Sequence, residues 1–173
     1  ITFENLQMDT MRNRAIVAKG SDSLIIKNCN IYGTGRNGIS VSGVNCQIKN
    51  NHIYDIGATG ISISGGDYEK IISSNNLVEN NHIHKVAQIE RSYNSGITVG
   101  YRSVGVTVRN NEIHDTPHAA IFIYGPEHLV EYNNIYDVVK EFHDMDAIYL
   151  NVNQYPWERG VVIRQNFIHD FGM

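Results

Sequence analysis

The segment Val106–Gly125, VTVRNNEIHDTPHAAIFIYG, decides the fold because it is the clearest copy of a unit that recurs along the whole chain. Two short runs in it, Val106–Val108 and Ala120–Ile123, have the patterns predicted for β-strands. An asparagine pair, the apolar Ile113 and a tight HDTPH turn lie between the two runs. Internal repetition of such a unit predicts a repeat architecture, in which each unit buries its apolar face against the next.

Seven copies of the first run align along the chain. They read ITFENLQM, LIIKNCNI, CQIKNNHI, NLVENNHI, VTVRNNEI, LVEYNNI and VVIRQNFI, and the apolar residues that close them are Met8, Ile31, Ile53, Ile83, Ile113, Ile135 and Ile168. A small residue followed by Ile marks the second run six times, at Ala15-Ile16, Gly38-Ile39, Gly60-Ile61, Gly96-Ile97, Ala120-Ile121 and Ala147-Ile148. In the first, second, third and fifth copies the closing residue precedes the second Ile by 8 residues, which indicates a turn of fixed length.

A unit of roughly 22 residues with a period of two is too short for a helical repeat and fits strands. Strands of one unit cannot pair with each other at this spacing, so each pairs with its counterpart in the next coil. The sequence therefore predicts an all-β fold, a parallel β-helix of about six to seven coils in a single domain over residues 1–173. We expect ends without caps, a segment of a longer protein, and end-to-end association through unpaired strand edges.

Side chains that recur in one column of the repeat are explained by the fold. Two asparagine columns are predicted to hydrogen-bond from coil to coil, and they are Asn5, Asn28, Asn50, Asn80, Asn110 and Asn51, Asn81, Asn111, Asn133, Asn166. Histidines also share columns, His84 with His114 and His169, and His52 with His82. The HxH pair His82 and His84 would suggest a metal site, but zinc needs three or four converging ligands and no partner motif is evident. We expect ladder residues there and no metal site.

Composition excludes several functions. The 173 residues carry a net charge of -4, so a basic nucleic-acid footprint is not supported. No run of about eighteen apolar residues exists, so membrane insertion as a helix is not expected. Cys29 and Cys46 make no metal motif, and we expect two buried small apolar residues rather than a disulfide.

Two copies depart from the repeat before their second run. Ile83 precedes Ile97 by 14 residues in HKVAQIERSYNSGI, and Ile135 precedes Ile148 by 13 in YDVVKEFHDMDAIYL. Both insertions are predicted on the same side of the solenoid, two coils apart, with the short HDTPHAA turn between them. Loops on a rigid scaffold commonly carry function, so we place the functional site there.

Carboxylates, imidazoles and aromatic rings gather on these segments, as sugar binding and glycosidic chemistry require. One carboxylic acid protonates the leaving oxygen, and a second carboxylate attacks or activates water. Two coils separate Glu90 from Asp144, about 9.6 Å at about 4.8 Å per coil, which is close to the separation in an inverting pair. The predicted catalytic residues are Asp144, Asp146 and Glu90, and the predicted substrate-binding residues are His118, His143, Tyr149, Tyr101, Arg102, Tyr124 and Arg91.

The run NNEIHDTPHAAIFIYGPEHLVEYNNIYDVVKEFHDMDAIYL resembles bacterial right-handed parallel β-helix carbohydrate-active enzymes, most of all the β-helical glycoside hydrolases that include α-L-fucosidases and xylanases, glycoside hydrolase family 141. The resemblance implies a right-handed single-stranded solenoid, a polysaccharide or oligosaccharide substrate, no cofactor, and an extracellular or periplasmic location. It maps His118 before Ala119-Ala120-Ile121 and Asp144 before Ala147-Ile148-Tyr149. Asp146 departs from the pattern, where Gly is expected.

Two other functions stay open. A polysaccharide lyase of the same fold needs a base and cations beside a uronate, often with calcium. Lys85, Arg91 and Arg102 are available for that role, but no acidic cluster clearly makes a calcium cage. A non-catalytic glycan-binding or structural module needs no acid pair, although the paired insertions favour an enzyme.

Overall fold

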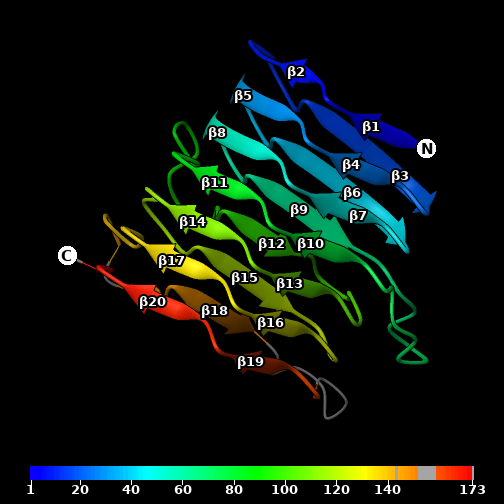
Figure 1. Ribbon diagram of the computed structural model, residues 1–173. Coiled ribbons are helices and arrows are strands. Elements are labelled where there is room, and N and C mark those ends of the chain that lie inside the picture. Colours follow the sequence, from blue (N-terminus) through cyan, green and yellow to red (C-terminus); the bar gives the residue numbers. More distant parts are fainter. Residues whose placement is uncertain (143, 152–158, 173) are drawn as a thin grey trace.

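The computed structural model describes residues 1–142, 144–151 and 159–172. Within these ranges there are twenty strands and no helix, and each full coil contributes one strand to each of three parallel sheets (Figure 1). The sheets run side by side along the axis, from the first coil at the N-terminus to the last at the C-terminus (Figure 1). The fold is the predicted right-handed, single-stranded parallel β-helix, with seven, seven and six strands in its sheets.

The strand bounds follow the repeat. The first sheet contains β1 (Thr2–Glu4), β4 (Ile25–Lys27), β7 (Gln47–Lys49), β10 (Leu77–Glu79), β13 (Thr107–Arg109), β16 (Leu129–Glu131) and β19 (Val162–Arg164). The second contains β2 (Gln7–Met8), β5 (Asn30–Thr34), β8 (His52–Ile56), β11 (His82–His84), β14 (Glu112–His114), β17 (Asn134–Tyr136) and β20 (Phe167–His169). The third contains β3 (Ile16–Asp22), β6 (Ile39–Val44), β9 (Ile61–Ser64), β12 (Ile97–Val99), β15 (Ile121–Tyr124) and β18 (Ile148–Asn151).

The coil has one strand more than the sequence predicted. The closing apolar residue, treated above as an anchor between two strands, is the centre of the second-sheet strand, as Ile113 is of β14. The asparagine pair makes the bend that separates this strand from the first. Its first residue has a left-handed backbone, with a φ of 54° at Asn110, a conformation that Asn tolerates better than most residues. One such residue therefore turns the chain sharply and starts a new strand.

The core is a set of apolar columns along the axis. Strand pairing is in register, so Ile83 lies against Ile53 on one side and Ile113 on the other, and Ile97 lies between Ile61 and Ile121. Central members of these columns are fully buried. In the last described coil Ile163 and Ile168 are 42% and 36% exposed. End-to-end association through such a face stays a prediction.

The second asparagine of each pair forms a buried ladder between the first and second sheets. The Asn81 Nδ2 donates to the Asn111 Oδ1 at 3.0 Å, and the Asn111 Nδ2 donates to the Asn133 Oδ1 at 3.0 Å. The same Asn111 Oδ1 accepts from the Asn81 backbone N–H at 3.0 Å. Each amide thus satisfies buried backbone groups of its neighbours as well as a side chain, which confirms the predicted ladder for Asn51, Asn81, Asn111, Asn133 and Asn166.

A different pair of residues serves the bend between the third and first sheets. The Asn76 Oδ1 accepts from the Cys46 N–H at 2.9 Å, and the His128 Nδ1 accepts from the Val106 N–H at 3.0 Å. The His128 Nε2 lies 3.0 Å from the Tyr124 carbonyl and donates to it. His128 is therefore a structural residue held as the neutral Nε2–H tautomer, and burial lowers its pKa to about 4.

The small residue before each third-sheet Ile has a steric cause. A Cβ at Gly60 would lie 2.6 Å from the Gly96 carbonyl oxygen of the next coil. Cys29 and Cys46 are buried and free, as predicted. In the described ranges no helix is long and apolar enough to cross a membrane.

Replacing Asn111 by Ala should lower the free energy of unfolding by about 3 to 5 kcal/mol, because several buried backbone and side-chain groups lose their partner at roughly 1 to 3 kcal/mol each. Chemical denaturation measures the loss. Asn110→Gly is the matched control, since Gly adopts a positive φ freely and the Asn110 side chain is exposed. Equal losses in the two variants would contradict a ladder-specific role.

The free energy of unfolding should fall as the pH drops from about 6.5 to 4. The unfolded chain takes up the His128 proton near pH 6.5, whereas the folded chain resists it down to a pKa of about 4, so acid favours unfolding. The full effect is about 3 kcal/mol at about 1.36 kcal/mol per pKa unit. His84 titrates in the same range, so the comparison is between wild type and His128→Asn, which should show the shallower pH dependence.

Candidate functional site

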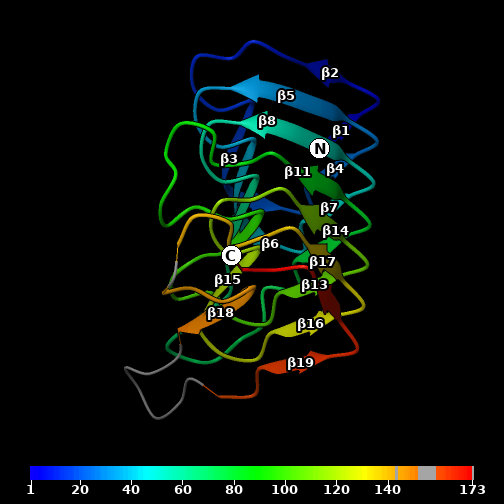
Figure 2. The ribbon, with the colours of Figure 1, turned by 90° about the vertical axis from the view of Figure 1, so that its left-hand side faces the viewer.

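The two inserted loops meet on one side of the solenoid, as the repeat predicted. The described parts of these loops are residues 85–96, 137–142 and 144–147, and Figure 2 shows both loops projecting from the same side of the coil stack. The Arg91 Nε donates to a Glu141 carboxylate oxygen at 3.0 Å, which joins the loops across the intervening turn. That turn contacts the second loop through its backbone, since the Glu141 N–H donates to the Pro117 carbonyl at 3.1 Å.

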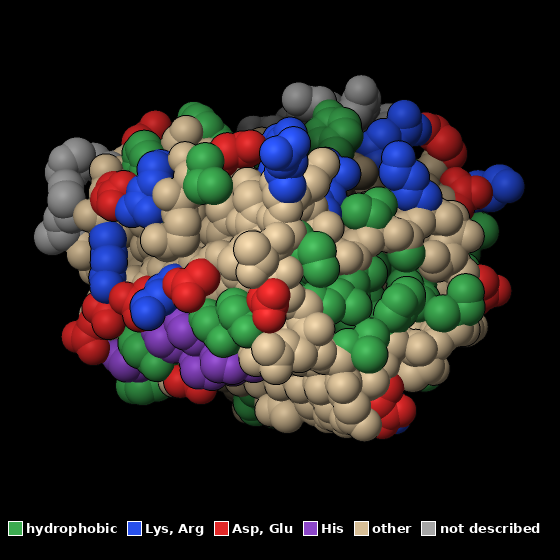
Figure 3. Space-filling model, turned by 90° about the horizontal axis from the view of Figure 1, so that it is seen from above, with side chains coloured by type: hydrophobic (Ala, Val, Ile, Leu, Met, Phe, Trp, Pro, Cys, Tyr) green, Lys and Arg blue, Asp and Glu red, His purple; other side chains and the backbone are tan. Residues whose placement is uncertain are grey.

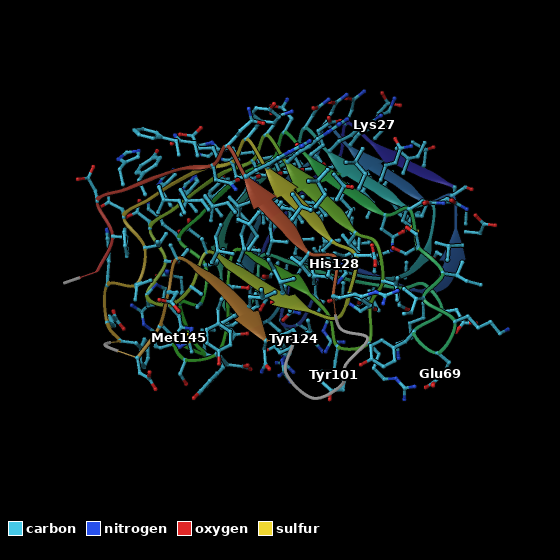
Figure 4. The ribbon with its side chains drawn as sticks, turned by 90° about the horizontal axis from the view of Figure 1, so that it is seen from below. Lys27, Glu69, Tyr101, Tyr124, His128 and Met145 are labelled. Carbon is cyan, nitrogen blue, oxygen red and sulfur yellow. The ribbon has the colours of Figure 1, made fainter. Side chains whose placement is uncertain are left out.

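A row of aromatic rings crosses the outer face of the third sheet beside these loops. The centroids of Tyr101 and Tyr124 are 6.1 Å apart, and those of Tyr124 and Phe122 are 6.3 Å apart. Phe122 lies 5.5 Å from His118 and 5.6 Å from Tyr149. Strand β15 positions this row because its alternate residues Ile121 and Ile123 face the core. Figure 4 shows Tyr124 and Tyr101 on the same outer side of the solenoid, with Met145 of the second loop along the same side.

The loops supply two more rings at one end of the row. Phe142 lies 4.8 Å from the His118 ring in an edge-on arrangement, and Tyr93 lies 5.3 Å from it. We call the set the aromatic row, and it comprises Tyr93, Tyr101, His118, Phe122, Tyr124, Phe142 and Tyr149. Phe122 and His118 form its buried floor at 2% exposure each, whereas Tyr93 is 75% exposed.

The phenol of Tyr124 lies in the middle of this row. Burial, and then the nearby phenols of Tyr149 and Tyr93, raise the pKa of Tyr124 above its usual value. Tyr124 therefore stays protonated at neutral pH. It offers a ring face together with a hydroxyl that can donate or accept a hydrogen bond.

His118 is buried among rings rather than exposed to solvent. Its backbone carbonyl accepts from the Thr116 hydroxyl at 2.6 Å and from the Val139 N–H at 3.1 Å, which ties the turn to the second loop. Its Nδ1 is buried and has no hydrogen-bond partner. Burial lowers the pKa of His118, so the imidazole is neutral at pH 7.

The predicted catalytic carboxylates are placed differently from one another. Asp144 and Asp146 are exposed at the end of the second loop, just before β18. Glu90 forms an ion pair with Arg36 of the second coil, with 3.1 Å between the Arg36 Nη2 and the Glu90 Oε1. Glu90 is therefore paired with a cation from an earlier coil, Arg36, and not with a residue of the two loops. Glu141 is likewise paired, and its hydrogen bond with Arg91 lowers its pKa.

Two more predicted binding residues, Tyr101 and Arg102, follow β12. Arg102 forms an ion pair with Glu69, and its guanidinium carbon lies 5.1 Å from the centroid of the Tyr68 ring. Tyr101 precedes it, just after β12, and closes the end of the row farthest from the loops. His143 lies outside the described residues.

A hollow of about 240 Å³ lies at the bend beneath the two loops. Charged side chains from both loops line it, among them Lys85, Arg91, Lys140 and Glu141. The Lys140 Nζ contacts the Asp115 carboxylate at 2.9 Å, which raises the pKa of Lys140. The bend is therefore charged, whereas the neighbouring sheet face is aromatic.

Three rings of the row, Tyr93, Phe122 and Phe142, are not among the predicted binding residues. Phe122 stands between two core isoleucines in AIFIY, where the apolar run conceals which side faces outward. Strand alternation from Ile121 is the signal that could have placed it on the outer face. No pattern in the loop sequence could have placed Phe142 against His118.

Comparison with known proteins agrees with the fold. The family model described as "Right handed beta helix region" matches residues 1–99. A solved structure titled "The complex structure of XylC with xylose" superposes with a TM-score of 0.53 at 20% sequence identity, covering 81% of this chain. This chain spans 22% of the length of that one. The search of curated proteins found no match.

Replacing His118 by Phe should leave the free energy of unfolding unchanged or raise it by about 1 kcal/mol. The new ring keeps the contacts with Phe122 and Phe142, and it removes a buried nitrogen that lacks a partner, a defect worth roughly 1 to 3 kcal/mol. Thermal and urea unfolding measure the change. A decrease in the free energy of unfolding above about 1 kcal/mol would show that the imidazole nitrogens stabilise the fold and are not available to a ligand.

Proposed function

Because the chain belongs to the right-handed β-helix family, whose rigid coils can hold a long row of side chains in register, we propose that it is a carbohydrate-active protein. In this proposal it binds a polysaccharide or oligosaccharide along the aromatic row and hydrolyses its glycosidic bonds. The observation that carries the proposal is the continuity of the row from Tyr101 to His118. A sugar chain presents alternating apolar ring faces and hydroxyls, and a row of rings with phenol groups complements both.

The catalytic step is assigned to the carboxylates of the second loop. Asp144 is exposed and follows Phe142 by two positions in the chain, and it would act as one member of the acid pair. Asp146 and Glu90 are the candidates for the other member, and Glu90 would have to act beside the Arg36 guanidinium. One carboxylic acid protonates the leaving oxygen, while the other carboxylate attacks the sugar or activates water.

Two further points complete the proposal. The structural neighbour is titled as a complex with xylose, so pentose-containing glycans such as xylan fragments are the first substrates to test. An extracellular or periplasmic location and independence from any cofactor belong to the same proposal, through the resemblance to secreted glycoside hydrolases.

The lyase alternative has less support from the charges. A lyase needs free cations to neutralise a uronate, yet two of the three available ones are paired, Arg91 with Glu141 and Arg102 with Glu69. Lys85, which lines the hollow beneath the loops, is the third. A non-catalytic glycan-binding module fits the row as well as an enzyme does. Such a module differs from the enzyme only in that Asp144 has no catalytic role.

The test pairs a binding variant with a catalytic one. Tyr124→Ala should weaken glycan affinity about tenfold or more, because truncation of a central aromatic contact costs roughly 2 kcal/mol. Asp144→Asn should keep affinity and reduce turnover about 10²- to 10⁴-fold. Glycan-array binding, calorimetry and release of reducing ends from xylan and other polysaccharides measure these changes.

Tyr132→Ala is the matched control, since Tyr132 is 50% exposed on another face. Binding without turnover by wild type would select the non-catalytic module. Release of unsaturated products would select the lyase. Absence of binding to every glycan tested would refute the proposal as a whole.

A further inference from the structure

The outer face of the second sheet carries a compact group of imidazoles that the sugar proposal does not use. In-register pairing stacks His52 on His82, and His84 on His114, in two neighbouring columns. The ring centroids are 4.8 Å apart within each of these pairs. Glu112 follows His82 in the first column. Figure 3 shows histidine side chains gathered in one region of the surface, with hydrophobic, acidic and basic side chains beside them.

The imidazole nitrogens of this group face each other diagonally between the columns. The Nε2 atoms of His82 and His114 lie 2.9 Å apart, and so do those of His52 and His84. Ligand atoms of His82, Glu112 and His114 all lie within 4.8 Å of one another, and those of His52, His82 and His84 do likewise. Sequence analysis expected no third ligand for the HxH pair. Coil stacking provides a third ligand for His82 and His84, namely His52 of the preceding coil.

The spacing suits a shared ion. Zinc binds imidazole nitrogen at about 2.0 to 2.1 Å, so two nitrogens in a tetrahedral site are about 3.3 Å apart. The observed 2.9 Å between the His82 and His114 nitrogens needs an opening of only about 0.4 Å. Small side-chain rotations supply such a change.

The set of His82, Glu112 and His114 also has supporting hydrogen bonds around it. The His114 Nδ1 donates to a carboxylate oxygen of Asp115 at 3.0 Å, so the His114 Nε2 carries a lone pair and accepts from the His82 Nε2. A metal ion would take the place of the proton between these two nitrogens. The Tyr136 hydroxyl donates to Glu112 at 2.9 Å. Partners of this kind orient metal ligands and raise their basicity. In the other set the His84 Nδ1 is buried and has no partner.

The site is accessible from the surface. A hollow of about 350 Å³ adjoins it, lined by His82 and Glu112 together with asparagines of the bend.

We propose that His82, Glu112 and His114 bind one divalent transition-metal ion of the zinc, nickel or copper class. Two imidazoles and a carboxylate suit these ions. Because β11 and β14 belong to adjacent coils, the ion also joins two coils on the outer face.

Zinc chloride titrated calorimetrically into the full, tag-free, chelator-treated chain should bind one ion per chain, and it should raise the melting temperature because only the folded state presents the site. His82→Asn and His114→Asn should weaken binding at least about 100-fold, whereas Asp115→Asn should weaken it about tenfold. Cobalt(II) added to the wild type should give the visible absorption of a four-coordinate nitrogen and oxygen site. This measurement uses the wild type alone and does not depend on the folding of any variant.

His169→Asn is the matched control, because His169 lies in the same column, outside both ligand sets, and stacks on Tyr136 at 5.1 Å. His52→Asn should also retain binding. Zinc binding that persists in His82→Asn, or its absence from the wild type, would overturn the site. Loss in His52→Asn with retention in His114→Asn would place the ion on the other set and overturn this assignment.

Discussion

The structure depends on hydrogen bonds between equivalent residues of successive coils. Backbone groups of each strand pair with the next coil, and the buried amide of Asn111 binds both Asn81 and Asn133 in the same way. An identical amide one coil away satisfies donor and acceptor together, so a sharp buried bend leaves little unpaired. Coil spacing and strand register follow from this constraint. Every side chain on the surface is consequently placed against the same position of its neighbours.

The stacking of equivalent positions brings residues that are distant in the sequence together on the surface. On the third sheet, Phe122 lies against Thr98 and Tyr149 through strand pairing, and loops from the fourth and sixth coils bring Tyr93 and Phe142 to His118. The result is an aromatic face beside a charged bend. On the second sheet, the same stacking brings imidazoles of three coils together. One rule of assembly thus supports a proposed glycan surface and a proposed metal site on different faces.

Ion pairs occupy several of the charged side chains that a catalytic mechanism at the loops would use. Arg91 and Arg102, two of the three cations that a uronate-binding lyase could use, are bound to Glu141 and Glu69. Glu90 is held by Arg36 rather than left beside Asp144 as a free acid. The proposal of sugar binding therefore rests on the aromatic row and not on any one catalytic pair.

The sequence by itself determined the coil length, the inward columns, the asparagine ladder and the side on which both loops project. These features follow directly from the alignment of the repeats with one another. Only the tertiary structure decided what lies between neighbouring columns. The third strand of each coil, the ring contacts of Phe142, the Arg36–Glu90 pair and the diagonal approach of His82 to His114 depend on bend angles and side-chain rotation. A repeat pattern specifies which residues share a column, but it contains no distance across columns or between loops.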